Sequence, residues 1–418
     1  MKILANVKAT LKKNKIFSTA NAKWKAARHK RLWRRVESRY SRGTAKDSIY
    51  NEKNALNQYR DRLNVEEMVP LKKPVGALNI FWVGASRDQD ESGFLQALRK
   101  IGTVTVFFNW TGDYGLWLKD EQGELTQASD SAAAKNDASL LEQIERAHES
   151  CPIDLLIGQM WANYLNPSSL TKIRSKGIPV INISMDDRLP DNWLPNRGKM
   201  MGALGLGSSV DIFLTTSAET CEWYWKDGFP AIFWPLASSP EVFMTTEKIV
   251  RDIDVLFIGN KYGYRETLIS GLRERGIYVE CRGAGWESGP ASAAVSASLF
   301  KRARIILGIG TVGHCTDVYT LKLRDFDAPM AGGLYITHRN PDLIELYKEG
   351  REIECYDSID ECATKIRYYL SNPEKLSQIA AAGQNIAIGR DTWDSRLTDT
   401  FIKLGFLEVS VDDKSKST

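Results

Sequence analysis

Ten short apolar runs, most of them separated by segments long enough for a helix, constrain the fold of this 418-residue chain more than any other feature. The runs are largely continuous rather than alternating, which is typical of strands buried on both faces of a parallel sheet. They form two series, and each series predicts a doubly wound α/β domain. The expected strands are Leu78–Gly84, Thr103–Phe108, Asp154–Gly158, Pro179–Ser184 and Asp211–Thr215, then Asp254–Gly259, Tyr278–Arg282, Arg304–Gly308, Leu334–Thr337 and Glu352–Tyr356.

The expected domain limits follow from these two series and from shifts in composition. Pro and Ser cluster at 235–240 ahead of a new strand, which is typical of a boundary between domains. We expect a basic helical extension at 1–76, a Rossmann-like acceptor domain at 77–238, a Rossmann-like nucleotide-sugar donor domain at 239–391, a C-terminal helix at 392–408 that packs back across the domains, and a disordered tail at 409–418.

The N-terminal segment is strongly basic. Residues 1–43 carry a net charge of +13 and the whole chain +4, so the remainder carries −9. Two basic amphipathic helices with a break around Ser18–Asn21 fit this segment, and the second has a contiguous apolar stripe. Such a segment could bind anionic lipid, nucleic acid or the acidic body of the protein itself. The stripe favours an anionic membrane surface, since nucleic acid needs no apolar face. The expected membrane contacts are Arg28, Arg31, Leu32, Trp33, Arg35, Val36 and Tyr40.

The cysteines indicate a reducing compartment. None of the six has CxxC spacing or a metal-type pairing with the four histidines. Cys151, Cys281 and Cys355 lie in or beside apolar runs, where cysteine usually acts as a small hydrophobe. The sequence shows neither an apolar run of about 18 residues nor a signal-peptide core. We therefore expect a cytoplasmic protein, with peripheral attachment to the inner face of the membrane as a further expectation.

The stretch Leu321–His338, LKLRDFDAPMAGGLYITH, predicts an anion site. Lys322 and Arg324 supply positive charge for a diphosphate, and Asp327 supplies a carboxylate for ribose hydroxyls. Gly333 is expected where ligand and backbone meet. A sugar nucleotide needs this set, so the segment favours a glycosyltransferase that uses a nucleotide-sugar donor.

A second candidate phosphate loop follows the strand DVLFIGN at 254–260. Gly259, Lys261 and Arg265 are expected to meet a pyrophosphate through backbone N–H groups and positive charge. An ordinary turn between strand and helix, with solvated charges, is the alternative.

The sequence Gly308–Gly313 matches the dinucleotide pattern GxGxxG. NAD is not expected, because the next strand ends in His338 and Arg339 instead of an acid that would bind the ribose. The loop remains compatible with another nucleotide, and His314 beside it is a candidate donor-binding residue.

Two DxD patterns, at 325–327 and 88–90, raise the question of a divalent cation. In a helix, positions i and i+2 lie about 200° apart and cannot share one ion. The second pattern lies in a charged loop, where such matches are frequent. No metal or other cofactor is therefore expected.

Asp186 and Asp187, just past a strand, are the candidate catalytic residues that accept a proton from an acceptor hydroxyl, with a helix cap or a solvated turn as the alternative.

The second half, from about Ile253 to Phe401, resembles the glycosyltransferase-like domain of the spore-maturation (CgeB-like) type, within the two-Rossmann-domain (GT-B) class. The segments that carry the resemblance are VLFIGN with Arg265, LKLRDFDAPMAGGLYITHRNPDL, Glu352–Tyr356, KIRYYLSNPEKLSQIAAAG and TWDSR.

The resemblance implies a cleft between two domains, with the donor held mainly by the second. Arg265, Lys322 and Arg324 would neutralise the diphosphate, and Asp327 would stand where relatives place a ribose-binding glutamate. Retaining relatives have another glutamate where this chain has Tyr319, so the stereochemistry is not predicted.

These observations together predict a glycosyltransferase that moves a sugar from a nucleotide-diphosphate donor to a glycan or lipid-linked acceptor, without a metal, in cell-surface glycan synthesis. Nucleic acid is not an expected partner. Two alternatives stay open: a non-catalytic module that binds a nucleotide or glycan, and a nucleic-acid-associated protein led by its basic arm.

Overall fold

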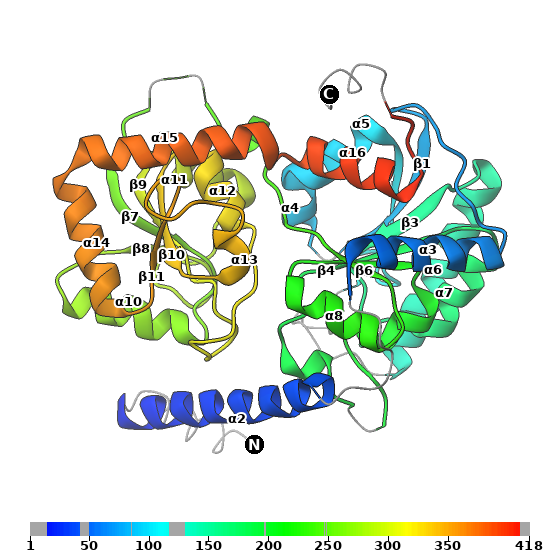
Figure 1. The fold of residues 1–418 in the computed structure, drawn as a ribbon, viewed down its shortest axis with the longest axis horizontal. Coiled ribbons are helices and arrows are strands. Elements are labelled where there is room, and N and C mark those ends of the chain that lie inside the picture. Colours follow the sequence, from blue (N-terminus) through cyan, green and yellow to red (C-terminus); the bar gives the residue numbers. More distant parts are fainter. Residues whose placement is uncertain are drawn as a thin grey trace.

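A computed structural model of the chain describes residues 15–41, 50–84, 86–116, 130–195, 198–245, 247 and 249–409. Within them the chain forms two parallel sheets flanked by helices, which lie side by side in Figure 1. The predicted α/β class with two doubly wound sheets is confirmed. The first predicted N-terminal helix and the predicted C-terminal tail from residue 410 on lie outside the described residues.

The first sheet has six described strands in the order β2-β1-β3-β4-β5-β6, all parallel. The chain reverses its direction of travel across the sheet between β1 and β3, which creates a crevice at their carboxyl ends. The sequence analysis did not predict β6, a three-residue strand that lies between Pro230 and Pro235. The strands are β1 (Leu78–Val83), β2 (Gly102–Val106), β3 (Leu155–Gly158), β4 (Val180–Ser184), β5 (Ile212–Thr215) and β6 (Ala231–Phe233).

The second sheet has five described strands in the order β11-β10-β9-β7-β8, also all parallel. Its reversal lies between β7 and β9, so a ligand is expected at the carboxyl ends of these two strands. The strands are β7 (Ile253–Ile258), β8 (Glu280–Arg282), β9 (Ala303–Leu307), β10 (Leu334–His338) and β11 (Glu354–Tyr356).

Helices cover both faces of each sheet, as continuously apolar strands require. Those of the first half are α3 (Glu52–Val65), α4 (Arg87–Gln89), the π-helical η1 (Asp90–Phe94), α5 (Leu95–Ile101), α6 (Asp130–Ser150), α7 (Pro167–Arg174), the short 3-10 helices η2 (Pro190–Asn192) and η3 (Leu204–Ser209), and α8 (Ala218–Lys226). Those of the second half are α9 (Pro240–Phe243), α10 (Tyr264–Glu274), α11 (Ala293–Arg302), α12 (Arg324–Met330), α13 (Pro341–Ile344), α14 (Ile359–Ser371) and α15 (Pro373–Arg390), followed by α16 (Trp393–Leu404).

The two halves are joined by two crossing segments that hydrogen-bond to each other. Ser238 N–H donates to Asp391 O over 2.9 Å, and Trp393 N–H donates to Ser238 O over 3.0 Å. Beyond this crossing, α16 returns to the first half, where Trp393 packs on Phe94 with 5.0 Å between ring centroids (Figure 1). Both crossings lie at one end of the gap between the sheets, and we call this connection between the two halves the hinge.

The described part of the basic N-terminal segment forms one helix, α2 (Lys15–Ser41), so the break predicted around Ser18–Asn21 is wrong. In Figure 1 this helix lies along the lower edge of both halves, at the end of the gap opposite the hinge. Its apolar stripe is buried against the first half, where Tyr40 stacks on Trp223 at 5.1 Å.

The membrane contacts predicted for the apolar stripe are wrong in this structure. Trp33, Val36 and Tyr40 are at most 4% exposed, because they pack on aromatic side chains of the first half. Leu32 is half-buried, whereas Arg28, Arg31 and Arg35 are exposed. The amphipathic pattern is therefore explained by packing on the protein itself.

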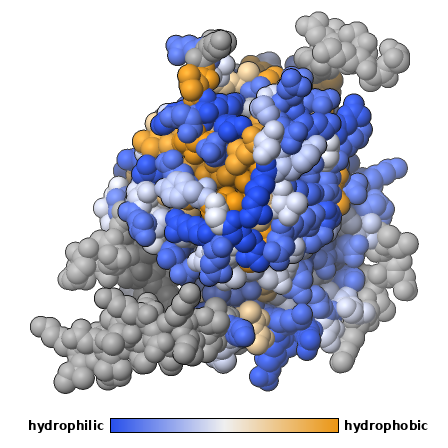
Figure 2. Space-filling view, turned by 90° about the vertical axis from the view of Figure 1, so that its left-hand side faces the viewer, coloured by the Kyte–Doolittle hydropathy of each residue, from blue (hydrophilic) through white to orange (hydrophobic). Residues whose placement is uncertain are grey.

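The surface of the second half carries both hydrophobic and hydrophilic regions. Seen from the side of the second half, hydrophobic residues gather in the upper central part of the face and hydrophilic residues surround them (Figure 2). Among the described residues, none of the helices combines the length and the apolar character that crossing a bilayer requires.

Five of the six cysteines are buried. Cys151 is exposed, which corrects its expected role as a small hydrophobe.

The burial of α2 predicts a difference between two serine substitutions in the same helix. Val36→Ser places a hydroxyl in a fully buried apolar site and is expected to lower the free energy of unfolding by about 2 kcal/mol. Arg34→Ser, on the exposed face, is expected to change it by less than about 0.5 kcal/mol. Urea unfolding followed by tryptophan fluorescence measures both, and equal values for the two variants would contradict the docking of α2.

Candidate functional site

Two buried arginines meet at the carboxyl end of β7. Gly259 follows this strand, and a Cβ atom there would lie 2.7 Å from Arg324 Nη2 and 3.2 Å from Arg265 Nη1. The two side chains reach this point from the first turns of α12 and α10, and their residues are only 8% and 9% exposed. Glycine is needed at position 259 because any side chain would displace the guanidinium groups.

Neither arginine forms an ion pair with a carboxylate of the described residues. Arg324 Nε donates to Ile258 O over 2.9 Å, but its buried Nη1 has no partner among them. Arg265 Nη1 donates to Asn260 O over 2.9 Å. Burial and the adjacent Arg324 charge lower the pKa of Arg265 to about 10. Two neighbouring buried cations are costly unless an anion compensates them, so this arrangement favours binding of a negatively charged group.

Aromatic faces hold the guanidinium groups in place. The Arg324 Cζ lies 4.7 Å from the ring centroid of Phe257, and the Arg265 Cζ lies 4.4 Å from that of Tyr262. Such contacts stabilise a partly desolvated guanidinium and leave its edge available for hydrogen bonds.

A third predicted cation, Lys322, contacts the other half of the molecule. Its Nζ lies 3.2 Å from Asp186 Oδ1, which follows β4 in the first half. The Lys322 side chain is 19% exposed and that of Asp186 is 50% exposed. The structure thus brings a predicted diphosphate-binding residue and a predicted catalytic carboxylate together across the gap between the sheets.

Asp187 points away from this gap. Its carboxylate is buried in the first half, where Oδ1 accepts a hydrogen bond of 2.9 Å from the Tyr224 hydroxyl. Oδ2 has no partner among the described residues, and burial raises the pKa of Asp187 to about 7. The predicted role of Asp187 in accepting a proton from an acceptor is therefore not compatible with this geometry, whereas Asp186 remains a candidate.

Asp327 lies beside the hinge. Its carboxylate accepts a hydrogen bond of 2.7 Å from Ser238 Oγ, and burial raises its pKa to about 7. Asp325 points elsewhere, to the Tyr335 hydroxyl and to Lys322 N–H. The two carboxylates of this DxD pattern do not converge, as expected for a helix. Binding of a ribose by Asp327 stays a prediction.

Two predicted donor-binding residues have other roles. A Cβ atom at Gly333 would lie 2.8 Å from Ile306 Cδ1, because Gly333 packs at the amino end of β10, opposite the ligand edge. The predicted contact between Gly333 and a ligand is therefore wrong. Lys261 Nζ lies 3.2 Å from Glu266 Oε1, so its charge is already paired.

His314 is half-buried in the loop after β9, on the side that faces α2. Burial, and then the nearby positive charges of Lys25 and His29, lower its pKa. The neutral imidazole that results is a hydrogen-bonding group rather than an additional cation.

The sequence analysis missed a cluster of uncharged polar groups beside the arginines. Loop 308–320 and the end of β10 are adjacent, since Asn340 approaches Gly310 and the His338 ring lies 6.1 Å from that of Tyr319. Buried hydroxyl and nitrogen atoms here lack hydrogen-bond partners among the described residues, which is unusual for buried polar groups. They are Thr311 Oγ1, Thr320 Oγ1, Thr337 Oγ1, His338 Nδ1 and Asn340 Nδ2.

Burial lowers the pKa of His338 to about 4, so its ring is neutral near pH 7. The cluster is therefore suited to binding an uncharged hydroxyl- or amide-bearing group. The polar residues after two neighbouring strands were visible in the sequence, but without the strand order they looked like ordinary loop residues.

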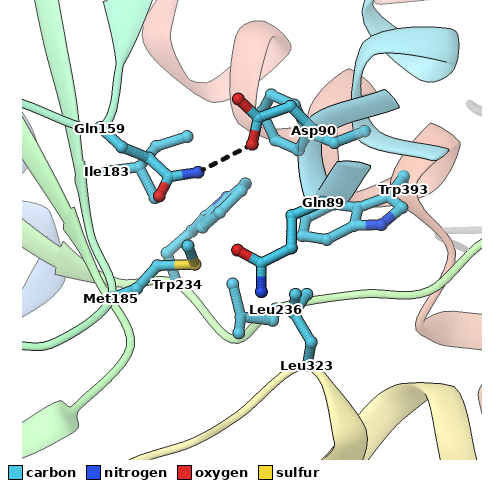
Figure 3. Close-up of a pocket in the computed structure, with 10 residues that line it drawn as sticks. Gln89, Asp90, Gln159, Ile183, Met185, Trp234, Leu236, Leu323 and Trp393 are labelled. Atoms are coloured by element: carbon cyan, nitrogen blue, oxygen red, sulfur yellow. Dashed lines mark hydrogen bonds between the residues drawn. The ribbon is translucent and has the colours of Figure 1, made fainter. Parts of the chain in front are cut away.

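A cavity lies at the corresponding crevice of the first sheet. It has a volume of about 20 Å³, room for about one water molecule, with Asp90 and Gln159 at one end and Leu236 and Leu323 at the other (Figure 3). Gln159 Nε2 donates to Asp90 Oδ1 over 3.4 Å, and the Tyr114 hydroxyl donates to Asp90 Oδ2 over 2.6 Å. Because Leu323 comes from the second half, this cavity lies between the two halves, but it is too small to hold a sugar.

The second DxD pattern does not form a cation site in this structure. Asp88 is exposed, whereas Asp90 is buried in the cavity wall. Among the described residues no three His, Cys, Asp or Glu side chains are grouped closely enough to hold a metal ion.

The buried carboxyl of Asp187 predicts a pH-dependent effect. The folded protein keeps this proton up to about pH 7, whereas an unfolded chain loses it near pH 4, so this group lowers stability as the pH rises between these values. Asp187→Asn removes the effect. The free energy of unfolding of Asp187→Asn should exceed that of wild type by an amount that increases from about pH 4 to about pH 7, reaches roughly 2–4 kcal/mol and stays constant at higher pH. Urea unfolding across the range measures it, and a gain independent of pH would contradict the buried, protonated carboxyl.

Residues 265–401 match the sequence profile of a family described as glycosyl transferase-like. The match starts at Arg265 and includes Lys322, Arg324 and Asp327. No curated protein sequence matches the chain significantly.

Solved structures with the same architecture include three at 10–12% sequence identity. HepE from Anabaena, crystallised with UDP, has a TM-score of 0.52 at 12% identity and covers 78% of this chain and 100% of its own. Sucrose-phosphate synthase from Thermosynechococcus elongatus has a TM-score of 0.55 at 10% identity, with coverage of 77% and 97%. A glycosyltransferase from Rickettsia africae has a TM-score of 0.51 at 10% identity, with coverage of 79% and 98%. The fold of this chain is therefore the GT-B fold, and its second half is glycosyl transferase-like in sequence.

Proposed function

We propose that this protein is a glycosyltransferase that takes a sugar from a nucleotide-diphosphate donor and passes it to the hydroxyl group of an acceptor. The observation that carries the proposal is the pair Arg265 and Arg324, two buried cations with no carboxylate partner in the part of the chain that the structure describes, at the strand ends where this fold binds ligands. The profile match of the second half and the fold shared with HepE, which was crystallised with UDP, agree with it.

The proposed chemistry needs no metal. When the bond between the anomeric carbon and the diphosphate oxygen breaks, negative charge develops on the leaving diphosphate. Arg265, Arg324 and Lys322 are positioned to stabilise that charge, which accelerates bond breaking. The hydroxyl oxygen of the acceptor molecule forms the new bond to the anomeric carbon. We propose that the Asp186 carboxylate takes up the proton of that hydroxyl group.

The acceptor, the pathway and the finer family type remain proposals. A glycan or lipid-linked acceptor in cell-surface glycan synthesis and the CgeB-like subtype rest on the sequence resemblance. Contact with an anionic membrane surface stays a prediction. Its support is the exposed positive charge of α2, including Arg28, Arg31 and Arg35, since the apolar stripe is buried.

One observation favours a non-catalytic nucleotide-binding module as the second candidate. Of the two predicted catalytic carboxylates, Asp187 is buried and Asp186 is paired with Lys322. Release of free sugar from UDP-, GDP- or dTDP-sugars supports an enzyme, and binding without any hydrolysis or transfer supports the module.

The arginine pair predicts a selective loss of affinity. Arg324→Ala should weaken binding of a nucleoside diphosphate by about 10- to 100-fold, because a charge-assisted contact to a partly buried anion contributes about 1.5–3 kcal/mol. The matched control is Arg302→Ala, whose guanidinium pairs with Asp252 at the surface. Isothermal titration calorimetry compares the two, and similar affinities for both variants would show that the anion binds elsewhere.

Metal-free binding can be tested directly. UDP, GDP or dTDP is expected to raise the melting temperature of the protein in the presence of EDTA, since a ligand at about 100 times its Kd stabilises the folded state by about 2.7 kcal/mol. Thermal unfolding with and without EDTA and Mg²⁺ measures this. Stabilisation that requires Mg²⁺ would overturn the metal-independent mechanism.

A further inference from the structure

The N-terminal helix α2 contacts both halves of the molecule. On the first half, the Trp33 and Trp223 rings lie 5.5 Å apart, and the Tyr40 hydroxyl donates to Asp227 over 2.5 Å. On the second half, Lys30 Nζ lies 3.3 Å from Asp317 Oδ2. Trp33 and Val36 share one apolar cluster with Val312, Cys315 and Val318 of the second half.

The contact with the second half depends on a glycine. Gly313 has φ +58°, and a Cβ atom there would lie 2.6 Å from His29 Cε1. The imidazole of α2 therefore rests directly on the backbone of the loop that follows β9. A side chain at position 313 would strain the backbone and displace the His29 imidazole.

The same loop supports the start of α10. Gly313 O accepts a hydrogen bond of 2.9 Å from Tyr264 N–H, and a Cβ atom at Gly263 would lie 1.9 Å from that oxygen. Tyr264 begins α10 and Arg265 follows it. A continuous set of contacts thus runs from His29 through Gly313 to the helix turn that carries one of the two arginines.

α2 also supports the loop on the opposite side of the gap. The Arg188 guanidinium lies 5.0 Å from the Trp33 ring centroid and 5.7 Å from that of Trp223. Arg188 comes two residues after Asp186, which pairs with Lys322 across the gap. One helix therefore contacts both the loop that carries Asp186 and the loop that supports the first turn of α10, where Arg265 lies.

We infer that α2 is a brace that holds these two loops in register, with His29 and Trp33 as positioning residues for Arg265 and Asp186. The predicted effect on diphosphate affinity rests on the proposed function, whereas the brace itself does not. The hinge connects the two halves at only one end of the gap, and α2 connects them at the other end. Loss of the α2 contacts is therefore expected to increase the mobility of the loops that must meet the donor.

The test uses the full-length protein with the double substitution His29→Ala and Lys30→Ala, which removes the contacts of these two side chains with Gly313 and Asp317 of the second half and keeps the anchor on the first. The control is Arg31→Ala, which removes one positive charge from the exposed face of the same helix. Hydrogen exchange of the unliganded proteins is measured for residues 260–266 and 311–319, with β3–β5 as the internal reference.

The double variant is expected to exchange faster in both segments, with β3–β5 unchanged, and to bind UDP at least about fivefold more weakly in calorimetry. The control should match wild type in both measurements. Unchanged exchange in the double variant, or an equal loss in the control, overturns the brace. Faster exchange together with unchanged UDP affinity overturns the positioning of Arg265.

Trp33→Phe serves as a second variant that keeps an aromatic anchor while reducing the contact with Arg188, and faster exchange at 184–190 is expected from it. Unchanged exchange there would overturn the role of Trp33. Should wild type bind no nucleoside diphosphate at all, the proposed function fails, and the exchange data still decide whether α2 braces the two halves.

Discussion

The charge of two neighbouring buried guanidinium groups is the constraint on which the rest of the candidate site depends. Arg265 and Arg324 repel each other, and burial removes the water that would screen them, so the arrangement is stable only with compensation. Aromatic rings and backbone carbonyls compensate in part. An anion at Gly259 would complete the compensation, and the parallel strand order places this point where both halves reach it.

The two halves contact each other through polar side chains. Asp186 pairs with Lys322, and Ser238 donates to Asp327. Under the proposed function, a diphosphate bound near Arg324 would compete with Asp186 for the Lys322 charge. Donor binding and release of the Asp186 carboxylate would then be linked through one ion pair between the two halves.

The sequence was sufficient to predict the main elements. Largely continuous apolar runs identified ten of the eleven described strands, because burial on both faces leaves few polar positions in such strands. Arg265, Lys322 and Arg324 were predicted as diphosphate ligands, and the structure brings the two arginines together and places Lys322 at the edge of the gap. Their charge type and their positions beside strand ends made them recognisable.

The remaining site residues depend on direction and packing, which a sequence pattern does not encode. Asp186 and Asp187 are neighbours, yet one faces the gap and the other the core. Gly333 serves strand packing instead of a ligand, since close approach to another backbone also requires glycine. An apolar stripe such as that around Trp33 has the same appearance whether it meets a membrane or the protein itself.

A crystal structure of the protein with a bound nucleoside diphosphate tests the central claim most directly. We expect phosphate oxygens within hydrogen-bonding distance of Arg324 Nη1 and the Arg265 guanidinium, beside Gly259, with Lys322 turned from Asp186 toward the diphosphate. A diphosphate bound at another place, with both guanidinium groups arranged as in the unliganded protein, would contradict the account.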